Sequence, residues 1–273
     1  MKYIYSFFIL ILLTLSLIFI SVPDNNLHVI ACNVGQGDAI LITYKSTEIL
    51  VDGGPDNKVL NCLSKFIPFW DKDIELVIST HPDADHSTGL IDVLKSYRVK
   101  SFAITAVDSG TKTYELLKKV LGGEGINIIK PYTGMKLGNS LIQLDVVHPP
   151  IGFETTKGTN DYSTTFILHY KNFSGLFPGD LDDNDINLVS TSMIPKVNYL
   201  KVPHHGSKNG LTRTLLDASD PQIAVISVGK NNSYGHPSKE VLNMLEAKGV
   251  KIERTDEVGD IEVVSNGDAW WLK

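Results

Sequence analysis

Four side chains that could bind a metal ion fall within six positions of the sequence. They are His81, Asp83, Asp85 and His86. Imidazoles and carboxylates crowded in this way repel one another or leave charge unpaired unless a cation lies among them. A solvated polar loop would explain one histidine alone. Two histidines and two carboxylates at this spacing favour a bound metal ion.

Further metal-capable residues recur along the chain, each close behind an apolar run that reads as a strand. These residues are Asp52, Asp180 and the pair His204 and His205. Four of the eight histidines therefore lie at predicted strand ends, which a random scatter would not produce. A two-metal centre with its ions roughly 3.5–4 Å apart needs such a concentration of ligands. The residues that nearly supply it are His81, Asp83, Asp85, His86, Asp180 and one of His204 and His205.

Two of these carboxylates also have simpler explanations. Asp52 precedes two glycines, so it could cap a turn or bend back towards the histidine cluster. Asp180, taken alone, reads as the N-cap of the helix that follows it. The sequence leaves both alternatives open.

The elements that must position these residues are strands interspersed with helices. Residues 75–79 read as a buried strand, and the cluster at 81–86 follows at a turn, where α/β folds usually place their chemistry. Strands are predicted over 27–34, 39–44, 48–51, 75–79, 102–105, 126–129, 140–147, 163–170, 175–177, 198–202, 223–228, 251–253, 260–264 and 269–272. Helices are predicted over 59–66, 87–95, 113–121, 182–190 and 238–247. No linker divides residues 27–273, so we expect one domain of two β-sheets with helices outside.

Composition and charge limit the class of protein. The chain has 273 residues, of which 42% are hydrophobic and 21% charged, as is ordinary for a globular protein. Its net charge of −6 argues against broad, non-specific phosphate contacts, because these need a basic surface. Any grip on nucleic acid must be local or mediated by metal. The two cysteines, Cys32 and Cys62, are too few for a disulfide scaffold, and the sequence leaves open whether they pair.

The first 22 residues differ from the rest of the chain. Lys2 is their only charge, and the 19 residues from Ile4 to Val22 are mostly apolar. This run is near the minimum length for a membrane span and also resembles a long signal peptide. No clear Ala-x-Ala cleavage site precedes Pro23. We therefore expect residues 1–22 to be either a cleaved signal or a membrane anchor, with residues 27–273 outside the cytoplasm.

The pattern H-x-D-x-D-H at 81–86 resembles the H-x-H-x-D-H signature of the metallo-β-lactamase superfamily, with Asp83 in place of the second histidine. Several further motifs, in order, resemble the hydrolase domain of ComEC-type DNA-uptake proteins. These motifs occupy residues 33–39, 51–54, 81–86, 160–163, 178–180, 201–207 and 234–237. The resemblance covers residues 27 to about 265, and seven motifs in order make it specific.

This resemblance implies a mixed α/β fold, the αββα four-layer sandwich, with two divalent ions at the edge between the sheets. The ions would be manganese or zinc, with magnesium also open, because Asp83 supplies a harder ligand than imidazole. They would lower the pKa of a bridging water, and the resulting hydroxide would attack a phosphodiester. Asp85 would also orient the hydroxide, while His204 and His236 would contact the phosphate or the leaving group. The implied metal ligands are His81, Asp83, Asp85, His86, Asp161, Asp180 and His205.

The chain departs from the family pattern in three ways. It has Asn33 where members often have aspartate, which affects a structural turn. The superfamily's third histidine is not obvious: Asp161 occupies the motif at that point and His148 competes with it, and we favour Asp161. The 273 residues contain no counterpart of the membrane channel of DNA-uptake proteins, so we expect that this chain alone does not translocate DNA.

Three classes of function follow from these observations. The first is an extracytoplasmic phosphodiesterase or nuclease that acts on DNA or a nucleotide. The second is another hydrolase of the same fold, such as a phosphocholine esterase or a β-lactamase, and the third is a non-catalytic binding module. The intact ligand set argues against the third, and the motifs at 204–207 and 234–237 favour the first over a β-lactamase. The expected partners are a phosphodiester, with DNA a candidate, and the membrane if residues 4–22 stay uncleaved; the sequence indicates no protein partner.

Overall fold

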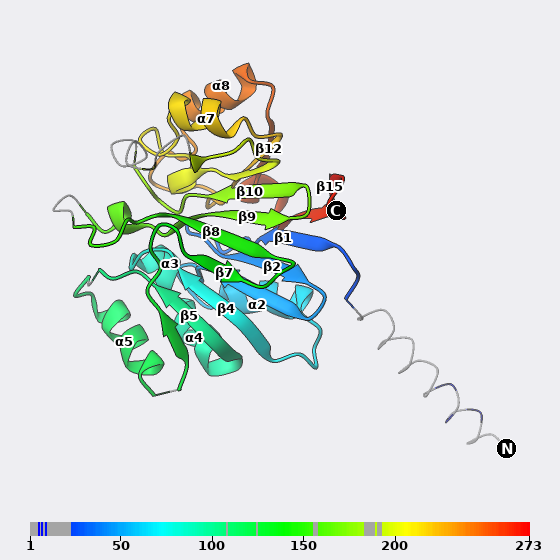
Figure 1. Cartoon of the computed structure of the whole chain (residues 1–273). Coiled ribbons are helices and arrows are strands. Elements are labelled where there is room, and N and C mark those ends of the chain that lie inside the picture. Colours follow the sequence, from blue (N-terminus) through cyan, green and yellow to red (C-terminus); the bar gives the residue numbers. More distant parts are fainter. Residues whose placement is uncertain are drawn as a thin grey trace.

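Two β-sheets face each other in the computed structural model (Figure 1), which describes residues 5, 7, 9, 23–107, 109–123, 125–154, 158–182, 189 and 193–273. Within these residues the first sheet has eight strands in the order β15 (Trp270–Leu272), β14 (Ile261–Ser265), β1 (Leu27–Ala31), β2 (Ile40–Tyr44), β3 (Thr47–Val51), β4 (Asp73–Ser79), β5 (Arg98–Ile104) and β6 (Asn127–Ile129). The second, counted over the same residues, has seven in the order β13 (Lys251–Arg254), β12 (Ile223–Ile226), β11 (Tyr199–Lys201), β10 (Phe173–Phe177), β9 (Thr165–Tyr170), β8 (Gln143–His148) and β7 (Lys136–Gly138).

Helices cover the outer face of each sheet. On the first sheet they are α2 (Lys58–Phe66), α4 (Leu90–Ser96) and α5 (Lys112–Leu121), and on the second α7 (Arg213–Ser219) and α8 (Lys239–Ala247). Short helical turns connect other elements: α3 (Ala84–Ser87), η1 (Asn160–Tyr162), η3 (Pro203–Gly206) and α9 (Thr255–Val258).

The apolar core has three layers, one between the two sheets and one between each sheet and its helices. One layer fills the space between the sheets and includes Ile42 and Phe166. A second joins the first sheet to its helices, and a third joins the second sheet to α7 and α8 through residues such as Leu200 and Leu216. Sheets and helices that each bury a face against a neighbour give the αββα sandwich. The fold expected from the sequence is therefore confirmed.

Strand β4 shows why this region reads as one continuous apolar run. It pairs in parallel with both β3 and β5. Ile74 and Val77 pack towards the helices, whereas Leu76 and Ile78 pack towards the other sheet. A parallel strand covered on both faces needs apolar residues at nearly every position. The carboxyl end of β4 delivers residues 80–86 to the edge of the sandwich.

The sequence-based elements need several corrections. The helix expected over 87–95 is α4, which begins at Leu90, and the short helix α3 lies in the segment before it that the sequence predicts as a turn. A Cβ atom at Gly89 would lie 2.0 Å from the carbonyl oxygen of Gly53, so only glycine allows this approach. Strand β7 and helices α7 and α9 were not expected. The helix expected over 182–190 lies, except for Asp182 and Val189, outside the described residues.

The two cysteines form a disulfide in the structure. Cys32 follows β1 and Cys62 lies in α2, with their Cα atoms 5.8 Å apart. The bond ties the first strand to the helix that covers it, and answers a question that the sequence left open. As for the apolar run 4–22, only residues 5, 7 and 9 of it are described. Among all described residues, no helix has both the length and the apolar character that crossing a membrane requires.

Candidate metal centre

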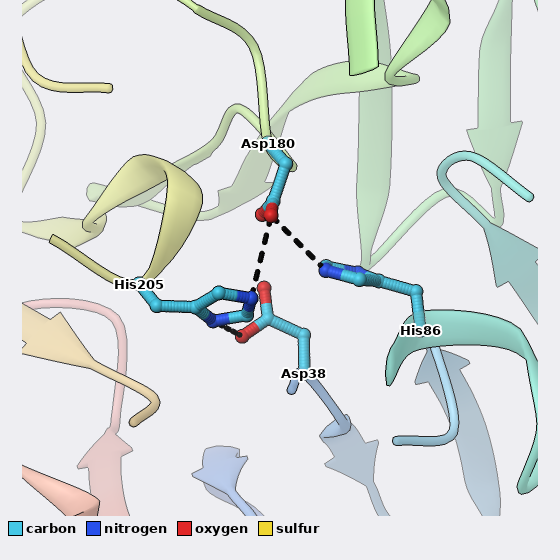
Figure 2. A group of neighbouring side chains, drawn as sticks. All are labelled: Asp38, His86, Asp180 and His205. Atoms are coloured by element: carbon cyan, nitrogen blue, oxygen red, sulfur yellow. Dashed lines mark ion pairs between the residues drawn. The ribbon is translucent and has the colours of Figure 1, made fainter. Parts of the chain in front are cut away.

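Three loops meet at one edge of the sandwich because each follows a strand that ends there. The loop after β4 carries His81 to His86, the turn after β10 carries Asp180, and η3 after β11 carries His205. Figure 2 shows the side chains of His86, Asp180 and His205 pointing towards one another from these separate elements. Strand ends that converge at one edge bring together residues far apart in the sequence.

Asp180 is the centre of this group. Its Oδ2 lies 3.2 Å from Nε2 of His86 and 3.3 Å from Nε2 of His205. The same Nε2 of His205 lies 3.4 Å from Oδ2 of Asp85. Three of the four side chains are almost fully buried, and that of Asp85 is 37% exposed. One carboxylate therefore faces solvent while the other ligand candidates are enclosed.

Several buried polar atoms in this group lack a hydrogen-bond partner in the described part of the chain. They are Nε2 of His81, His86 and His205 and Oδ1 of Asp180. The rings of His81 and His86 are only 4.1 Å apart, centre to centre. Leaving such atoms unpaired in the interior is unfavourable. Imidazole nitrogens and carboxylate oxygens are ligands for divalent metals such as zinc and manganese, so the residues present fit a divalent metal ion.

A second set of sequence-predicted ligands lies beside His81. Its Nε2 is 3.8 Å from Oδ2 of Asp83, and the hydroxyl of Thr159 donates to Oδ1 of Asp83 at 2.6 Å. Asp161 is buried in η1, directly after this threonine's loop. His148, the competing residue, has its Nε2 2.7 Å from the main-chain carbonyl of Asp161, so that ring nitrogen is engaged by the backbone. Its other ring nitrogen, Nδ1, is buried without a hydrogen-bond partner among the described residues, so both His148 and Asp161 remain candidates and the ligand role of Asp161 stays a prediction.

Asp52 orients His81 and His86 through contacts on the Nδ1 side of their rings. Its Oδ2 lies 2.8 Å from Nδ1 of His86, and its two oxygens accept hydrogen bonds from the main-chain N–H and the hydroxyl of Thr80. The hydroxyl of Thr80 is in turn 3.0 Å from Nδ1 of His81. Contacts at Nδ1 direct the Nε2 atoms of both rings towards Asp180 and Asp83. Of the two alternatives, the structure shows Asp52 bending back to the cluster, where it orients the ligand candidates.

Asp38 is a site residue that the sequence analysis missed. Its carboxylate lies 2.7 Å from Nζ of Lys201 and 3.3 Å from Nδ1 of His205. A carboxylate oxygen of Asp38 lies within 4.8 Å of the ligand atoms of His86, Asp180 and His205. Figure 2 shows the carboxylate beside the ring of His205. It meets His205 at Nδ1, however, whereas Asp180 and Asp85 meet Nε2 on the other side of the ring. Nδ1 of His205 also lies 3.0 Å from the carbonyl of Ser227, and Oδ1 of Asp38 is buried without a hydrogen-bond partner in the described part of the chain, so Asp38 joins the residues that could hold an ion.

The glycines around Asp38 allow this arrangement. The N–H of Asp38 donates to the carbonyl of Asp85 at 3.2 Å. A Cβ atom at Gly37 would lie 2.2 Å from the same oxygen. The segment that the sequence identifies as a turn is thus packed directly beneath the metal-binding loop. The only sequence signal for this role was the carboxylate that follows the second glycine.

Comparison with protein-family models identifies the superfamily of this chain. The model described as "Metallo-beta-lactamase superfamily" matches residues 32–230. The chain belongs to this superfamily. Its members are typically metal-dependent hydrolases, which agrees with the buried Asp and His donors described above.

Curated relatives with similar sequences are competence and recombination proteins, which confirms the resemblance to the ComEC type. ComE operon protein 3 of Bacillus subtilis (strain 168) is 27% identical over 249 residues, covering 84% of this chain and 32% of the relative. Recombination protein 2 of Haemophilus influenzae is 25% identical, covering 94% of this chain and 31% of the relative. Competence protein ComA of Neisseria gonorrhoeae is also 25% identical, covering 89% of this chain and 33% of the relative. The chain spans about a third of the length of these relatives.

Solved structures support the fold alone, because their sequence identities are low. The diiron β-hydroxylase CmlA from Streptomyces venezuelae has a TM-score of 0.57 at 14% identity, covering 85% of this chain and 53% of that one. The metallo-β-lactamase fold protein YhfI from Bacillus subtilis has a TM-score of 0.57 at 12% identity, covering 86% and 99%. A diphosphatase from the PhnP family has a TM-score of 0.52 at 15% identity, covering 88% and 98%.

The electrostatics of this metallo-β-lactamase site depend on its buried charges. Burial alone would lower the pKa of His86, but Asp180 and Asp52 raise it well above the usual value. Burial would likewise lower the pKa of His205, which Asp180 and Asp38 raise well above its usual value. Without a metal, both rings thus hold protons that balance the carboxylates. A bound ion would take over this role and release protons.

The two other predicted functional histidines lie at the rim of the superfamily site. Nδ1 of His204 is 2.8 Å from Oδ1 of Asp182, and the ring of His236 is 6.0 Å from that of His204. Both rings are partly exposed, unlike the buried group around Asp180. Their assignment to substrate contacts stays a prediction, and their position outside the buried group is consistent with it.

Proposed function

We propose that this metallo-β-lactamase superfamily protein is an extracytoplasmic phosphodiesterase that acts on DNA or a nucleotide. The observation that carries the proposal is the group of unpaired buried donors around Asp180, which fits divalent metal ions at the edge of a hydrolase fold. Similarity to competence and recombination proteins supports a nucleic-acid substrate. The net charge of −6 makes the metal centre, and not a basic surface, the main attraction for phosphate.

The residues divide into two ligand groups for two divalent ions. His86, Asp180, His205 and Asp85 would hold one ion, and His81, Asp83 and Asp161 the other, with Asp180 near both groups. When bound, such ions neutralise phosphate charge and make a water acidic. Asp85 is the exposed member of its group, so its carboxylate can orient a water at the substrate side and accept its proton.

Other functions of the same fold are testable alternatives. A panel of DNA, RNA, a cyclic dinucleotide, a phosphocholine ester and nitrocefin, offered to the metal-loaded full-length protein, separates them. We expect metal-dependent cleavage of at least one nucleotide phosphodiester and no turnover of nitrocefin. Preferential hydrolysis of nitrocefin or of the phosphocholine ester would move the assignment to a β-lactamase or an esterase. A complete lack of turnover would favour a binding module.

The metal preference follows from the oxygen content of the site. Asp83 stands where a superfamily signature has histidine, so the ligands are harder than in a histidine-rich zinc site. After removal of metal by chelation, manganese is expected to restore activity at least as well as zinc. Magnesium is the second candidate. The test is initial rate against concentration of each ion, and restoration by zinc alone would contradict the proposal.

The location of the protein is expected to be outside the cytoplasm. The apolar run from Ile4 to Val22 suits an export signal or an anchor, and the Cys32–Cys62 disulfide suits an oxidising compartment. Fractionation of cells that produce the full-length protein should recover it in the membrane or the medium. A Cys62→Ser variant, which cannot form the disulfide, is fractionated in parallel, so that the effect of the disulfide on recovery is separated from that of residues 4–22. Recovery of uncleaved protein from the soluble cytoplasm would refute this part of the proposal.

A further inference from the structure

A row of aromatic rings runs from the metal centre to the surface. It starts at the ligand candidate His205, whose ring is 6.3 Å from that of His204. The ring of His236 follows at 6.0 Å, and Tyr234 lies 5.8 Å beyond it. Tyr234 and His236 are stacked, with 15° between their planes. The side chain of Tyr234 is 70% exposed, so one face of its ring rests on His236 and the other is open.

The loop that carries Tyr234 is held in place by its own hydrogen bonds. Oδ1 of Asn232 accepts from the N–H groups of Tyr234 and His236, and its Nδ2 donates to the carbonyls of Gly229 and His236. At one end Gly229 donates to Oε1 of Gln36, and at the other Ser238 donates to the carbonyl of Gly206. These contacts tie the loop to the two segments beside the metal centre. Tyr234 is therefore a preorganised platform and not a loose surface ring.

The charge around the row suits an anion. Lys208 follows η3 and Lys230 opens the loop, and both are exposed. Neither forms an ion pair within the described part of the chain, whereas Lys65, Lys100 and Lys196 all do. The carboxylate of Asp182, by contrast, lies 2.8 Å from Nδ1 of His204 and is balanced by that ring. A nucleotide offers a phosphate for the metal centre and lysines, and a flat base for the tyrosine.

We propose that Tyr234 is a stacking site for a nucleobase next to the phosphate held at the metal centre. The inference rests on the proposed phosphodiesterase function and narrows its substrate to nucleotides with an unpaired base. Base stacking on an aromatic ring is tolerant of sequence and contributes substantially to single-strand binding. The platform thus selects single-stranded nucleic acid or a dinucleotide over paired DNA, because a paired base is already stacked on its neighbours.

The test compares an intact base with a missing one. Full-length protein loaded with manganese is offered short thymidine oligonucleotides, matched oligonucleotides with one abasic tetrahydrofuran position on either side of the cleaved bond, and a dinucleotide. The variants are Tyr234→Ala and Tyr234→Phe. The control is Phe69→Ala, because Phe69 is also 70% exposed but lies before β4, at the strand end opposite to His81. Circular dichroism confirms that each variant is folded.

The wild type and the variants Tyr234→Phe and Phe69→Ala should prefer the intact base by roughly tenfold in kcat/KM, and Tyr234→Ala should lose this preference. A base preference that Tyr234→Ala retains would overturn the inference and leave the proposed function standing. Comparison of kcat/KM for the dinucleotide with kcat/KM for the longer oligonucleotides shows which of these two kinds of substrate the site prefers.

Binding gives a second measurement that does not depend on turnover. Fluorescence anisotropy of labelled oligonucleotides is measured in an Asp85→Asn background, with and without Tyr234→Ala. A base preference in binding that depends on Tyr234, without cleavage by the wild type, would support the stacking site and refute the phosphodiesterase. Tyr234-dependent binding of a phosphocholine ester, with no base preference, would overturn the inference in favour of a cation site.

Discussion

Replacement of Asp85 by alanine should lower kcat by a factor on the order of 10²–10³ or more, as removal of one preorganised catalytic group does. Oδ2 of Asp85 lies 3.4 Å from Nε2 of His205, and Asp85 is the exposed carboxylate of its group. Burial would raise its pKa, but the contacts with His205 and His86 lower it, so the side chain is an anion at neutral pH. In the proposed mechanism, the substitution removes both a metal ligand and the group that orients the water. Steady-state kinetics together with metal analysis measure both losses.

His236→Ala is the matched comparison. His236 lies at the rim, beyond His204, so this variant should retain its full metal content while its rate falls. If His236→Ala empties a metal site, then His236 is a ligand and the role of His205 must be reassigned. Near-normal turnover by Asp85→Ala on the true substrate would show that the two-metal hydrolase assignment is wrong.

Lys201→Met should destabilise the metal-free protein by about 3–5 kcal/mol, since it breaks a buried ion pair from one side. The side chains of Lys201 and Asp38 are 1% and 3% exposed, and Nζ of Lys201 is 2.7 Å from Asp38 and 2.9 Å from the carbonyl of Val202. Burial would raise the pKa of Asp38, but Lys201 and His205 hold it well below its usual value. Without Lys201 a buried carboxylate lacks its main partner. Denaturant unfolding in the presence of a chelator measures the change.

Two further variants sharpen this test. The pair Lys196 and Asp220 has the same 2.7 Å separation, but its side chains are 79% and 43% exposed. Lys196→Met should therefore leave the unfolding midpoint unchanged. The double variant with Asp38→Asn and Lys201→Met also removes the buried carboxylate charge that Lys201→Met leaves without its partner. It should therefore recover part of the lost stability. A midpoint for Lys201→Met equal to that of Lys196→Met would show that the buried pair contributes nothing.

The sequence predicts the fold well because apolar runs and strand ends are local signals. β4 reads as a buried strand from its own residues, and Asp180 and His205 stand out because each closely follows such a run. Asp38 gives no comparable signal. A carboxylate after two glycines reads as a turn residue, and Lys201, its partner, lies in a strand far along the chain. Only tertiary packing brings the two charges together beneath His205.

The start of α4 was misplaced for a similar reason. The apolar spacing extends the expected helix back to Ser87, whereas α4 begins at Leu90 and Ser87 ends α3. Gly89, between the two helices, approaches Gly53 so closely that a Cβ atom there would lie 2.0 Å from its carbonyl oxygen. That approach is a contact between two loops, and the local sequence pattern does not reveal it.

The pairing of β1 with β14 sets an order for the biosynthesis of the molecule. β1 can pair with β2 early, but His28 lies opposite Val264, so the other edge of β1 stays unpaired on a growing polypeptide until Ile261–Ser265 have left the ribosome. Asp180, His205 and the loop from Gly229 to Ser238 are also translated well after the loop that carries His81 to His86. The nascent chain is therefore long exposed to misfolding. The candidate metal centre therefore assembles only after His205 has been made, long after the loop that carries His81 to His86.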